Sequence, residues 1–302
     1  MSKVIIFDGN FFLHRAWSVA SKHRDPKELK KNSLTSFLNS VCTLSKERRA
    51  THVLVVFDSG RSFRNDIYPK YKANRGKEKS VTIVKADGTE YKTEVTAGSL
   101  VRDAKKIMTL SGITYSQVNG YEGDDLFACS INSLQDLEDA RIIIEGHTRD
   151  KDMLSLIREN VKIYRPIEKQ LMDSDAVFKE WGVLPRQMRD MLCLVGDKVD
   201  NIPGIPGWGP KTAAKFLNTY SSIKKALDNK EGRKALLPYL DIIQLSRALV
   251  TLKKDIHYEL KDLIIQDFEN ELTEYVWKIP DALKDLGDVR KAASIRGLFR
   301  KR

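Results

Sequence analysis

The chain has 302 residues, of which 52 are lysine or arginine and 41 are aspartate or glutamate, so its formal net charge is +11 at pH 7. Such a surplus suggests a polyanionic partner, although ribosomal, membrane-surface and nucleic-acid-binding proteins all share it. The three cysteines and five histidines show no pairing or metal-ligand spacing, which argues against a disulfide framework and a zinc site. No stretch approaches the ~20 apolar residues of a membrane span, so we expect a cytoplasmic protein without a membrane partner.

Continuous apolar, β-branched runs are typical of strands that are buried on both faces of a parallel sheet. Such runs lie at residues 4–7, 53–57 and 142–144. Helix-like segments lie at 33–48, 100–111 and 123–137. This alternation predicts an α/β fold with a doubly wound, mostly parallel sheet. Ligands of such folds bind beyond the carboxyl ends of the strands.

The stretch 60–99 is basic in its first half and β-rich in its second. Seven lysines and arginines between Arg61 and Lys79 stand against two acidic residues. Two β-rich runs around Asp87 and Gly88, within residues 81–95, predict a β-hairpin. Basic and aromatic residues here suit the passage of a single nucleic-acid strand, with a solvated lysine-rich loop as the alternative.

From about residue 166 the pattern is mostly helical, apart from a stretch rich in glycine and proline at 203–210. Gly204, Gly207 and Gly209 would allow tight turns and a close approach of another chain. Pro210 suits the first turn of a helix whose free N–H groups bind anions, and Lys211 adds a positive charge. We interpret the region as a helix–hairpin–helix that grips a duplex backbone, the alternative being a tight loop between packed helices. The spacing of a nucleotide-binding P-loop is absent.

Acidic residues are the candidate chemistry of the chain. They are Asp8, Asp58, Glu122, Asp124, Asp125, Asp150, Asp152, Asp197 and Asp200. Taken singly, each has a structural explanation as a turn, a helix cap or a solvated loop. Several of them follow predicted strands and would gather at one sheet edge, where like charges cost free energy unless cations neutralise them. Oxygen ligands without histidine or cysteine suit two Mg²⁺ or Mn²⁺ ions about 3.5–4 Å apart, as nucleases use.

Five motifs in order resemble the 5′ nuclease family, which includes flap endonucleases, phage 5′–3′ exonucleases and the N-terminal nuclease domain of bacterial DNA polymerase I. They are VIIFDGN with Arg15, VFDSGRSFRNDIYPKYKANR, YEGDD, TRDKD and GDKVDNIPGIPGWGPKTA, and the resemblance covers residues 3–265. It implies a free-standing, phage-type, divalent-metal-dependent 5′–3′ exonuclease and flap endonuclease. It also implies a PIN-like nuclease core at 1–165 with an arch insertion at 60–99, a helix–hairpin–helix lobe at 166–270, and a C-terminal helical segment with a basic tail at 271–302.

The resemblance also implies residue roles. The first ion would be bound by Asp8, Asp58, Glu122 and Asp124. The second would be bound by Asp150, Asp152 and Asp197 together with Asp124 or Asp125. Asp200 would be a further ligand of this ion or an outer-shell partner. The scissile phosphate would be contacted by Lys72 and Arg75, other phosphates by Arg15 and Arg64, and a terminal base by Tyr71. The duplex would be held by Gly204, Gly207, Gly209 and Lys211, with K⁺ on the loop carbonyls.

The implied partner is DNA with 5′ ends, flaps or nicks, and the RNA–DNA hybrid, a sliding clamp and a single-strand-binding protein are further candidates. A monomer is expected. The arch of the family is usually helical, whereas residues 81–95 predict a hairpin. There are two alternative functions. A PIN-type ribonuclease is disfavoured by the sequence GDxxDNxPG. A catalytically inactive binder of branched DNA is disfavoured by the intact acids. A haloacid-type phosphatase needs an aspartate where this chain has Asn10.

Overall fold

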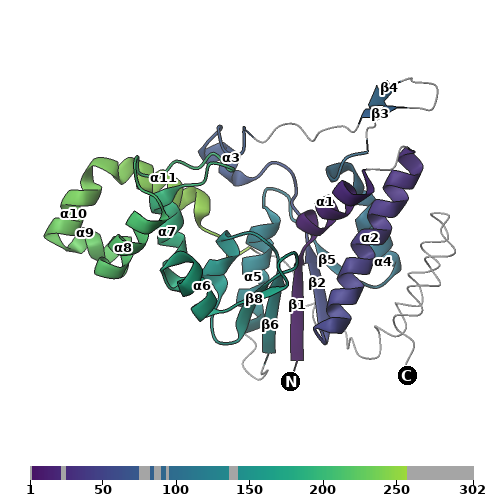
Figure 1. The fold of residues 1–302 in the computed structure, drawn as a ribbon, viewed down its shortest axis with the longest axis horizontal. Coiled ribbons are helices and arrows are strands. Elements are labelled where there is room, and N and C mark those ends of the chain that lie inside the picture. Colours follow the sequence, from purple (N-terminus) through teal and green to yellow (C-terminus); the bar gives the residue numbers. More distant parts are fainter. Residues whose placement is uncertain are drawn as a thin grey trace.

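The computed structural model describes residues 2–21, 25–74, 82–84, 90–92, 95–135 and 142–256. Its centre is a six-stranded sheet in the order β5-β2-β1-β6-β7-β8 (Figure 1). The strands are β1 Ser2–Asp8, β2 His52–Val56, β5 Thr114–Ser116, β6 Ile142–His147, β7 Val161–Arg165 and β8 Gln170–Met172. All neighbours pair in parallel except β7 and β8. The predicted doubly wound, mostly parallel sheet is therefore confirmed.

Both faces of the central strands are buried, which explains why their sequences are continuously apolar. Along β1, Val4 and Ile6 belong to one hydrophobic cluster, while Ile5 and Phe7 belong to the other. Successive side chains of a strand point to opposite faces, so each face receives its own layer of helices.

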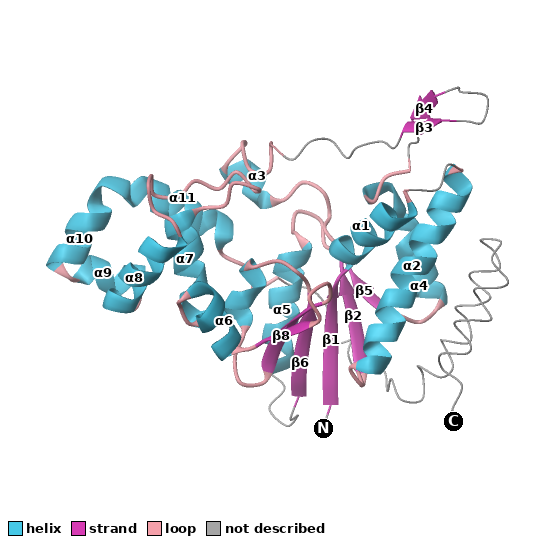
Figure 2. Ribbon diagram, viewed as in Figure 1, coloured by secondary structure: helices cyan, strands magenta, loops and turns pink. Residues whose placement is uncertain are grey.

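Helices α1 Gly9–Ala20, α2 Pro26–Glu47 and α4 Val101–Leu110 cover one face, and α5 Gly123–Gln135 covers the other (Figure 2). The segments predicted at 100–111 and 123–137 correspond to α4 and α5. Helix α2 begins earlier than predicted because the Asp25 side chain caps it, accepting a hydrogen bond from Lys27 N, and Pro26 occupies its first turn.

The hairpin predicted at 81–95 is confirmed for the residues that the structure describes. Strands β3 Thr82–Val84 and β4 Glu90–Lys92 pair antiparallel, with Ile83 opposite Tyr91. The turn at Asp87 and Gly88 and the basic residues Arg75, Lys77 and Lys79 lie outside the described residues.

The second half of the chain is mainly helical. Its helices are α6 Ser174–Trp181, α7 Met188–Val195, α8 Pro210–Tyr220, α9 Ile223–Asp228, α10 Lys230–Leu236 and α11 Leu240–Val250. Strand β8 completes the sheet beyond residue 165, where we expected the core to end. The segment predicted at 271–302 lies outside the described residues. None of the helices in the described ranges is both long and apolar enough to cross a membrane.

Candidate active site

The carboxyl ends of β1, β2 and β6 meet at one edge of the sheet, and aspartates follow each of them. The parallel register places Asp8 opposite Val56, two residues before Asp58, and places Phe7 opposite His147, three residues before Asp150. The N-terminal end of α5 brings Asp124 to the same edge, because Gly123 N donates a hydrogen bond of 2.7 Å to Asp58 Oδ1. The convergence predicted from the sequence is therefore present.

Asp8 is the N-cap of α1, with Oδ1 accepting from Phe11 N at 3.0 Å and Oδ2 accepting from Thr148 Oγ1 at 2.9 Å. Burial raises the pKa of Asp8 to about 7, and the charges of Asp58 and Asp150 contribute to the increase. The capping explanation therefore holds for Asp8, while its role as an ion ligand stays a prediction.

Asp58 is fixed by contacts on three sides. Its main-chain N donates to Asn10 Oδ1 at 2.9 Å, its carbonyl accepts from Gln117 Nε2 at 2.5 Å, and its side chain caps α5 at Gly123. A Cβ at Gly123 would lie 3.2 Å from Asp58 Oδ1, so this helix start favours glycine.

The acids form two groups that share Asp150. Burial and the charges of Asp150, Asp8 and Asp58 raise the pKa of Asp124 well above its ordinary value. Burial and the charge of Asp150, together with those of Asp197 and Asp200, raise the pKa of Asp152 likewise. We call the first group, Asp8, Asp58, Asp124 and Asp150, the inner acids, and the second, Asp150, Asp152, Asp197 and Asp200, the outer acids.

The chemistry of both groups suits hard divalent cations, because every donor is a carboxylate oxygen and each group carries repulsion that a cation would relieve. Within the described part of the chain, no three His, Cys, Asp or Glu side chains stand so close together that they form a ready ion site. The predicted ligand sets therefore depend on the carboxylate chemistry of these residues and on their mutual repulsion.

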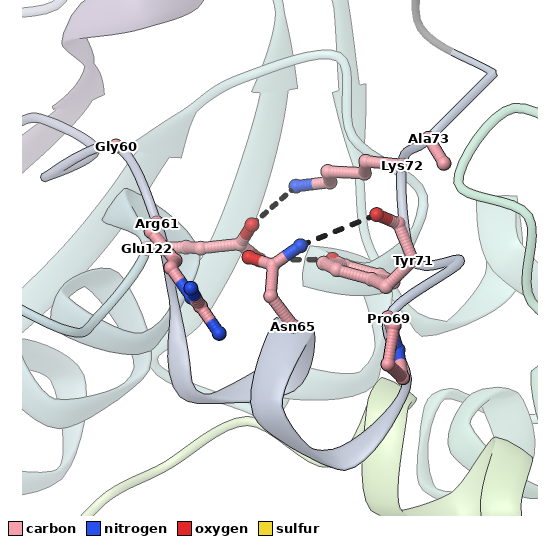
Figure 3. Close-up of a pocket in the computed structure, with 8 residues that line it drawn as sticks. All are labelled: Gly60, Arg61, Asn65, Pro69, Tyr71, Lys72, Ala73 and Glu122. Atoms are coloured by element: carbon pink, nitrogen blue, oxygen red, sulfur yellow. Dashed lines mark hydrogen bonds and ion pairs between the residues drawn. The ribbon is translucent and has the colours of Figure 1, made fainter.

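Glu122 lies beside the acids in a pocket of about 580 Å³ that Lys72 and Tyr71 also line (Figure 3). Its Oε1 accepts from Lys72 Nζ at 2.6 Å, and its Oε2 accepts from Tyr71 OH at 2.9 Å and Arg64 Nη1 at 3.2 Å. Both oxygens are therefore engaged. Lys72 Nζ also lies 3.8 Å from Asp200 Oδ2, so this cation stands between the two parts of the site.

Two predicted roles are corrected by burial. Arg64 is 2% exposed and donates to both oxygens of Asp125, at 2.6 and 2.7 Å, and to Leu249 O at 2.7 Å. A guanidinium held in the interior does not reach a phosphate. Asp125 is 0% exposed, and its Oδ1 also accepts from Lys253 N, so its oxygens face this ion pair instead of an ion. The pair connects α3 Phe63–Ile67, α5 and the end of α11.

Tyr71 does not fit the stacking role expected for it. Its side chain is buried, its hydroxyl is bonded to Glu122, and Lys72 Nζ lies 5.0 Å from the centre of its ring. At 4% exposure the side chain offers little surface for a stacked base in this arrangement. Arg15 is exposed on α1, and Arg75 lies outside the described residues.

The predicted helix–hairpin–helix is formed by α7, the loop 196–209 and α8. A Cβ at Gly204 would lie 2.1 Å from Val195 O, Gly207 has a φ of +79°, and Gly209 directly precedes α8. Pro210 occupies the first turn of α8, and Lys211 is exposed next to it. The loop lines a pocket of about 480 Å³ together with Tyr68 and Val195.

The sequence analysis missed three polar residues within the acidic motifs. Thr148 Oγ1 accepts from Asp150 N at 3.1 Å while donating to Asp8, so it joins two aspartates. Lys151 forms an ion pair with Asp197 at 2.5 Å, and this contact outweighs burial and raises the pKa of Lys151. Asn10 holds the main chain of Asp58. Their position next to the acids in VIIFDGN and TRDKD was the available signal.

Comparison with known proteins gives two adjoining family models. The family model for the 5′–3′ exonuclease N-terminal resolvase-like domain matches residues 3–182, and that for the 5′–3′ exonuclease C-terminal SAM fold matches residues 183–271. The 5′–3′ exonuclease of Aquifex aeolicus is 30% identical over 99% of this chain and 100% of its own length. DNA polymerase I of Rhizobium leguminosarum is 30% identical over 88% of this chain, which spans 26% of that protein.

Two solved structures share the fold. T5 5′-exonuclease with bound divalent zinc ions has a TM-score of 0.66 at 17% identity, covering 98% of both chains. The catalytic core of Rad2 in complex with a DNA substrate has a TM-score of 0.55 at 17% identity, covering 98% of this chain and 91% of that one.

Proposed function

Because the chain belongs to the 5′–3′ exonuclease family and is a 5′ nuclease, we propose that it hydrolyses phosphodiesters of DNA at 5′ ends, nicks and flaps with two divalent ions. The observation that carries the proposal is the pair of acidic groups at the carboxyl edge of the sheet, joined at Asp150. The T5 and Rad2 structures, with metal ions and DNA respectively, are consistent with it.

The inner acids Asp8, Asp58 and Asp124 would hold the first Mg²⁺ or Mn²⁺, and the outer acids Asp152 and Asp197 the second, with Asp150 between them. Glu122 becomes a partner of Lys72 at the edge of the first site, because its carboxylate is already paired with two cations, the Lys72 ammonium and the Arg64 guanidinium. Asp200 lies near Lys72 and serves as an outer partner. When bound, the ions would activate water and neutralise charge on the leaving oxygen.

The chain itself supplies positioning and charge. Lys72 would contact the scissile phosphate and stabilise the charge that develops on it, since its ammonium stands between Glu122 and Asp200. The corresponding contact of Arg75 with the scissile phosphate stays a prediction. In-line attack would leave a 5′ phosphate and a 3′ hydroxyl on the products.

The helix–hairpin–helix of α7, the loop 196–209 and α8 would hold duplex DNA by its phosphates and not by its bases. The free N–H groups of the first turn of α8 and the exposed Lys211 suit phosphate, and Gly207 and Gly209 leave open space where another chain can approach. K⁺ on the loop carbonyls and the contact of Arg15 with a phosphate belong to the same proposal. RNA–DNA hybrids, a sliding clamp, a single-strand-binding protein, a cytoplasmic location and the monomeric state stay predictions.

A cleavage assay with three 5′-labelled substrates tests the proposal: a blunt duplex, a 5′ flap and an RNA–DNA hybrid, each with Mg²⁺, Mn²⁺ or EDTA. We expect metal-dependent release of flap-length fragments. Release of only mono- and short oligonucleotides would identify an exonuclease alone. Tight flap binding without cleavage in any metal would favour the inactive binder of branched DNA.

A further inference from the structure

The turn that carries Lys72 is joined to the loop that carries Asp197 and Asp200. We call residues 70–74 the cation turn and residues 197–201 the acid loop. Asn201 Nδ2 donates to Lys70 O at 2.7 Å, Lys72 N donates to Asp200 O at 2.9 Å, and Asn74 Nδ2 donates to Lys198 O at 2.6 Å. The two segments are more than 120 residues apart in sequence, so these three bonds form a tertiary clasp.

The backbone on both sides of the clasp is unusual. Lys72 has a φ of +55° and Asn201 a φ of +57°, in the left-handed region that residues other than glycine rarely adopt. Asparagine tolerates this region better than most residues, but a lysine there persists only where its surroundings fix it. The clasp supplies that constraint, because Lys72 N is itself one of its donors.

The other side of the cation turn is held by α3. Asn65 Nδ2 donates to Tyr71 O at 3.3 Å, as Figure 3 shows. The turn is thus fixed between α3 and the acid loop, and its lysine points to Glu122. Nothing in the proposed ligand sets or phosphate contacts uses the amides of Asn74 and Asn201.

We propose that Asn74 and Asn201 are positioning residues, which set the place of the Lys72 ammonium relative to the carboxylates and thereby to the scissile phosphate. The acid loop is the first part of the hairpin loop 196–209, so the clasp transmits the position of the duplex to this cation. The proposal rests on the proposed role of Lys72. Because precise placement affects the reacting geometry more than ground-state binding, loss of the clasp slows the chemical step.

The test uses Asn74→Ala and Asn201→Gly, the second of which keeps the left-handed backbone available while it removes the amide. Asn218→Ala is the matched control, since its exposed amide also joins two segments, donating to Gly182 O at 2.9 Å. Single-turnover rates at saturating enzyme, flap affinity and thermal unfolding are measured for each. We expect both clasp variants to slow cleavage on the order of ten-fold with little change in affinity, while the control cleaves like the wild type.

A double-mutant cycle separates positioning from simple structural support. In the Lys72→Ala background, Asn74→Ala is expected to cause no further loss, because the group that it positions is gone. A further loss of the same ten-fold, or a loss of affinity alone, would overturn the inference. A slow Lys72→Ala enzyme beside a fully active Asn74→Ala enzyme would overturn only the inference. A fully active Lys72→Ala enzyme would remove the proposed role of Lys72, and the inference with it.

Discussion

Asp150 is the residue on which both parts of the proposed metal site depend. Its negative charge contributes to the raised pKa values of Asp8, Asp124 and Asp152. Its main-chain N is held by Thr148, which also bonds Asp8. Removing this carboxylate changes both acidic groups at once, whereas each other acid belongs to one.

We therefore expect Asp150→Ala to reduce the single-turnover cleavage rate by at least about 100-fold, since even outer partners of a bound metal are worth ~10–100-fold. Flap affinity, measured in Ca²⁺ by fluorescence anisotropy, should change little. Asp241→Ala removes an exposed acid on α11 and serves as the control. Normal cleavage by Asp150→Ala would contradict the proposed ligand sets.

Among the elements, α3, α5 and the end of α11 are connected by one buried ion pair. Arg64 bonds Asp125 and Leu249 O, and Asp125 bonds Lys253 N. Removing one partner of such a pair leaves a buried charge without its main partner, which is more costly than losing both. Without Asp125, Arg64 would keep only the longer carboxylate contact of 3.2 Å to Glu122.

Asp125→Ala and Arg64→Met should each lower the free energy of unfolding by about 3–5 kcal/mol. The double variant should lose less than the sum of the two, because neither charge then remains unpaired. Urea unfolding measures all three. Additive losses would show that the two side chains act independently. An Arg64→Met enzyme with normal stability but weak DNA binding would restore the phosphate contact expected from the sequence.

A second network joins β1, β6 and Arg48, the residue after α2. Burial would raise the pKa of Glu145, but hydrogen bonds from His147, Arg48 and Lys3 outweigh it and hold that pKa below its ordinary value. Burial lowers the pKa of His147, whose Nε2 lies 2.8 Å from Glu145 Oε1 and whose ring packs against Phe7. The carboxylate is therefore stabilised in its ionised form.

A lowered pKa in the folded state stabilises the protein above the unfolded value of about 4.3, and this contribution is lost as the pH falls through the folded pKa. Glu145→Gln should thus be clearly less stable than the wild type at pH 7, and the difference should shrink on acidification below about pH 4. Chemical unfolding at several pH values checks this. The exposed Glu231→Gln is the control. A difference that does not vary with pH would show that the ionised form is not favoured.

At the scale of the whole molecule, the net charge of +11 matters for binding more than for fold. Duplex binding through phosphates releases counterions, so affinity falls steeply with salt. Lys211 lies at the start of α8, where the proposed contact with the duplex is made.

Lys211→Ala should weaken duplex binding by a similar factor for every sequence and lower the slope of log affinity against log salt by about 1. Titrations between low and high salt measure that slope. Lys46→Ala, in the last turn of α2 at the opposite edge of the sheet, should leave the slope as in the wild type. An unchanged slope for Lys211→Ala would place the duplex elsewhere.

The sequence by itself determined the strands, the acidic edge of the sheet and the helix–hairpin–helix. A buried parallel strand is continuously apolar over neighbouring residues, and the carboxyl ends of such strands share an edge wherever the sheet forms. Asp8, Asp58 and Asp150 could therefore be placed together before any contact was known. Gly204 and Pro210 marked the hairpin, because backbone constraints of this kind are local.

The tertiary structure alone decided which charged residue faces the site and which is buried. From their motifs, Arg64 is predicted to contact a phosphate and Asp125 an ion. Instead they bond each other across 61 residues of sequence and are buried. The clasp between Asn201 and Lys70 spans 131 residues. Such pairings depend on the packing of distant elements, and a charged side chain carries no local pattern that tells an interior partner from a substrate.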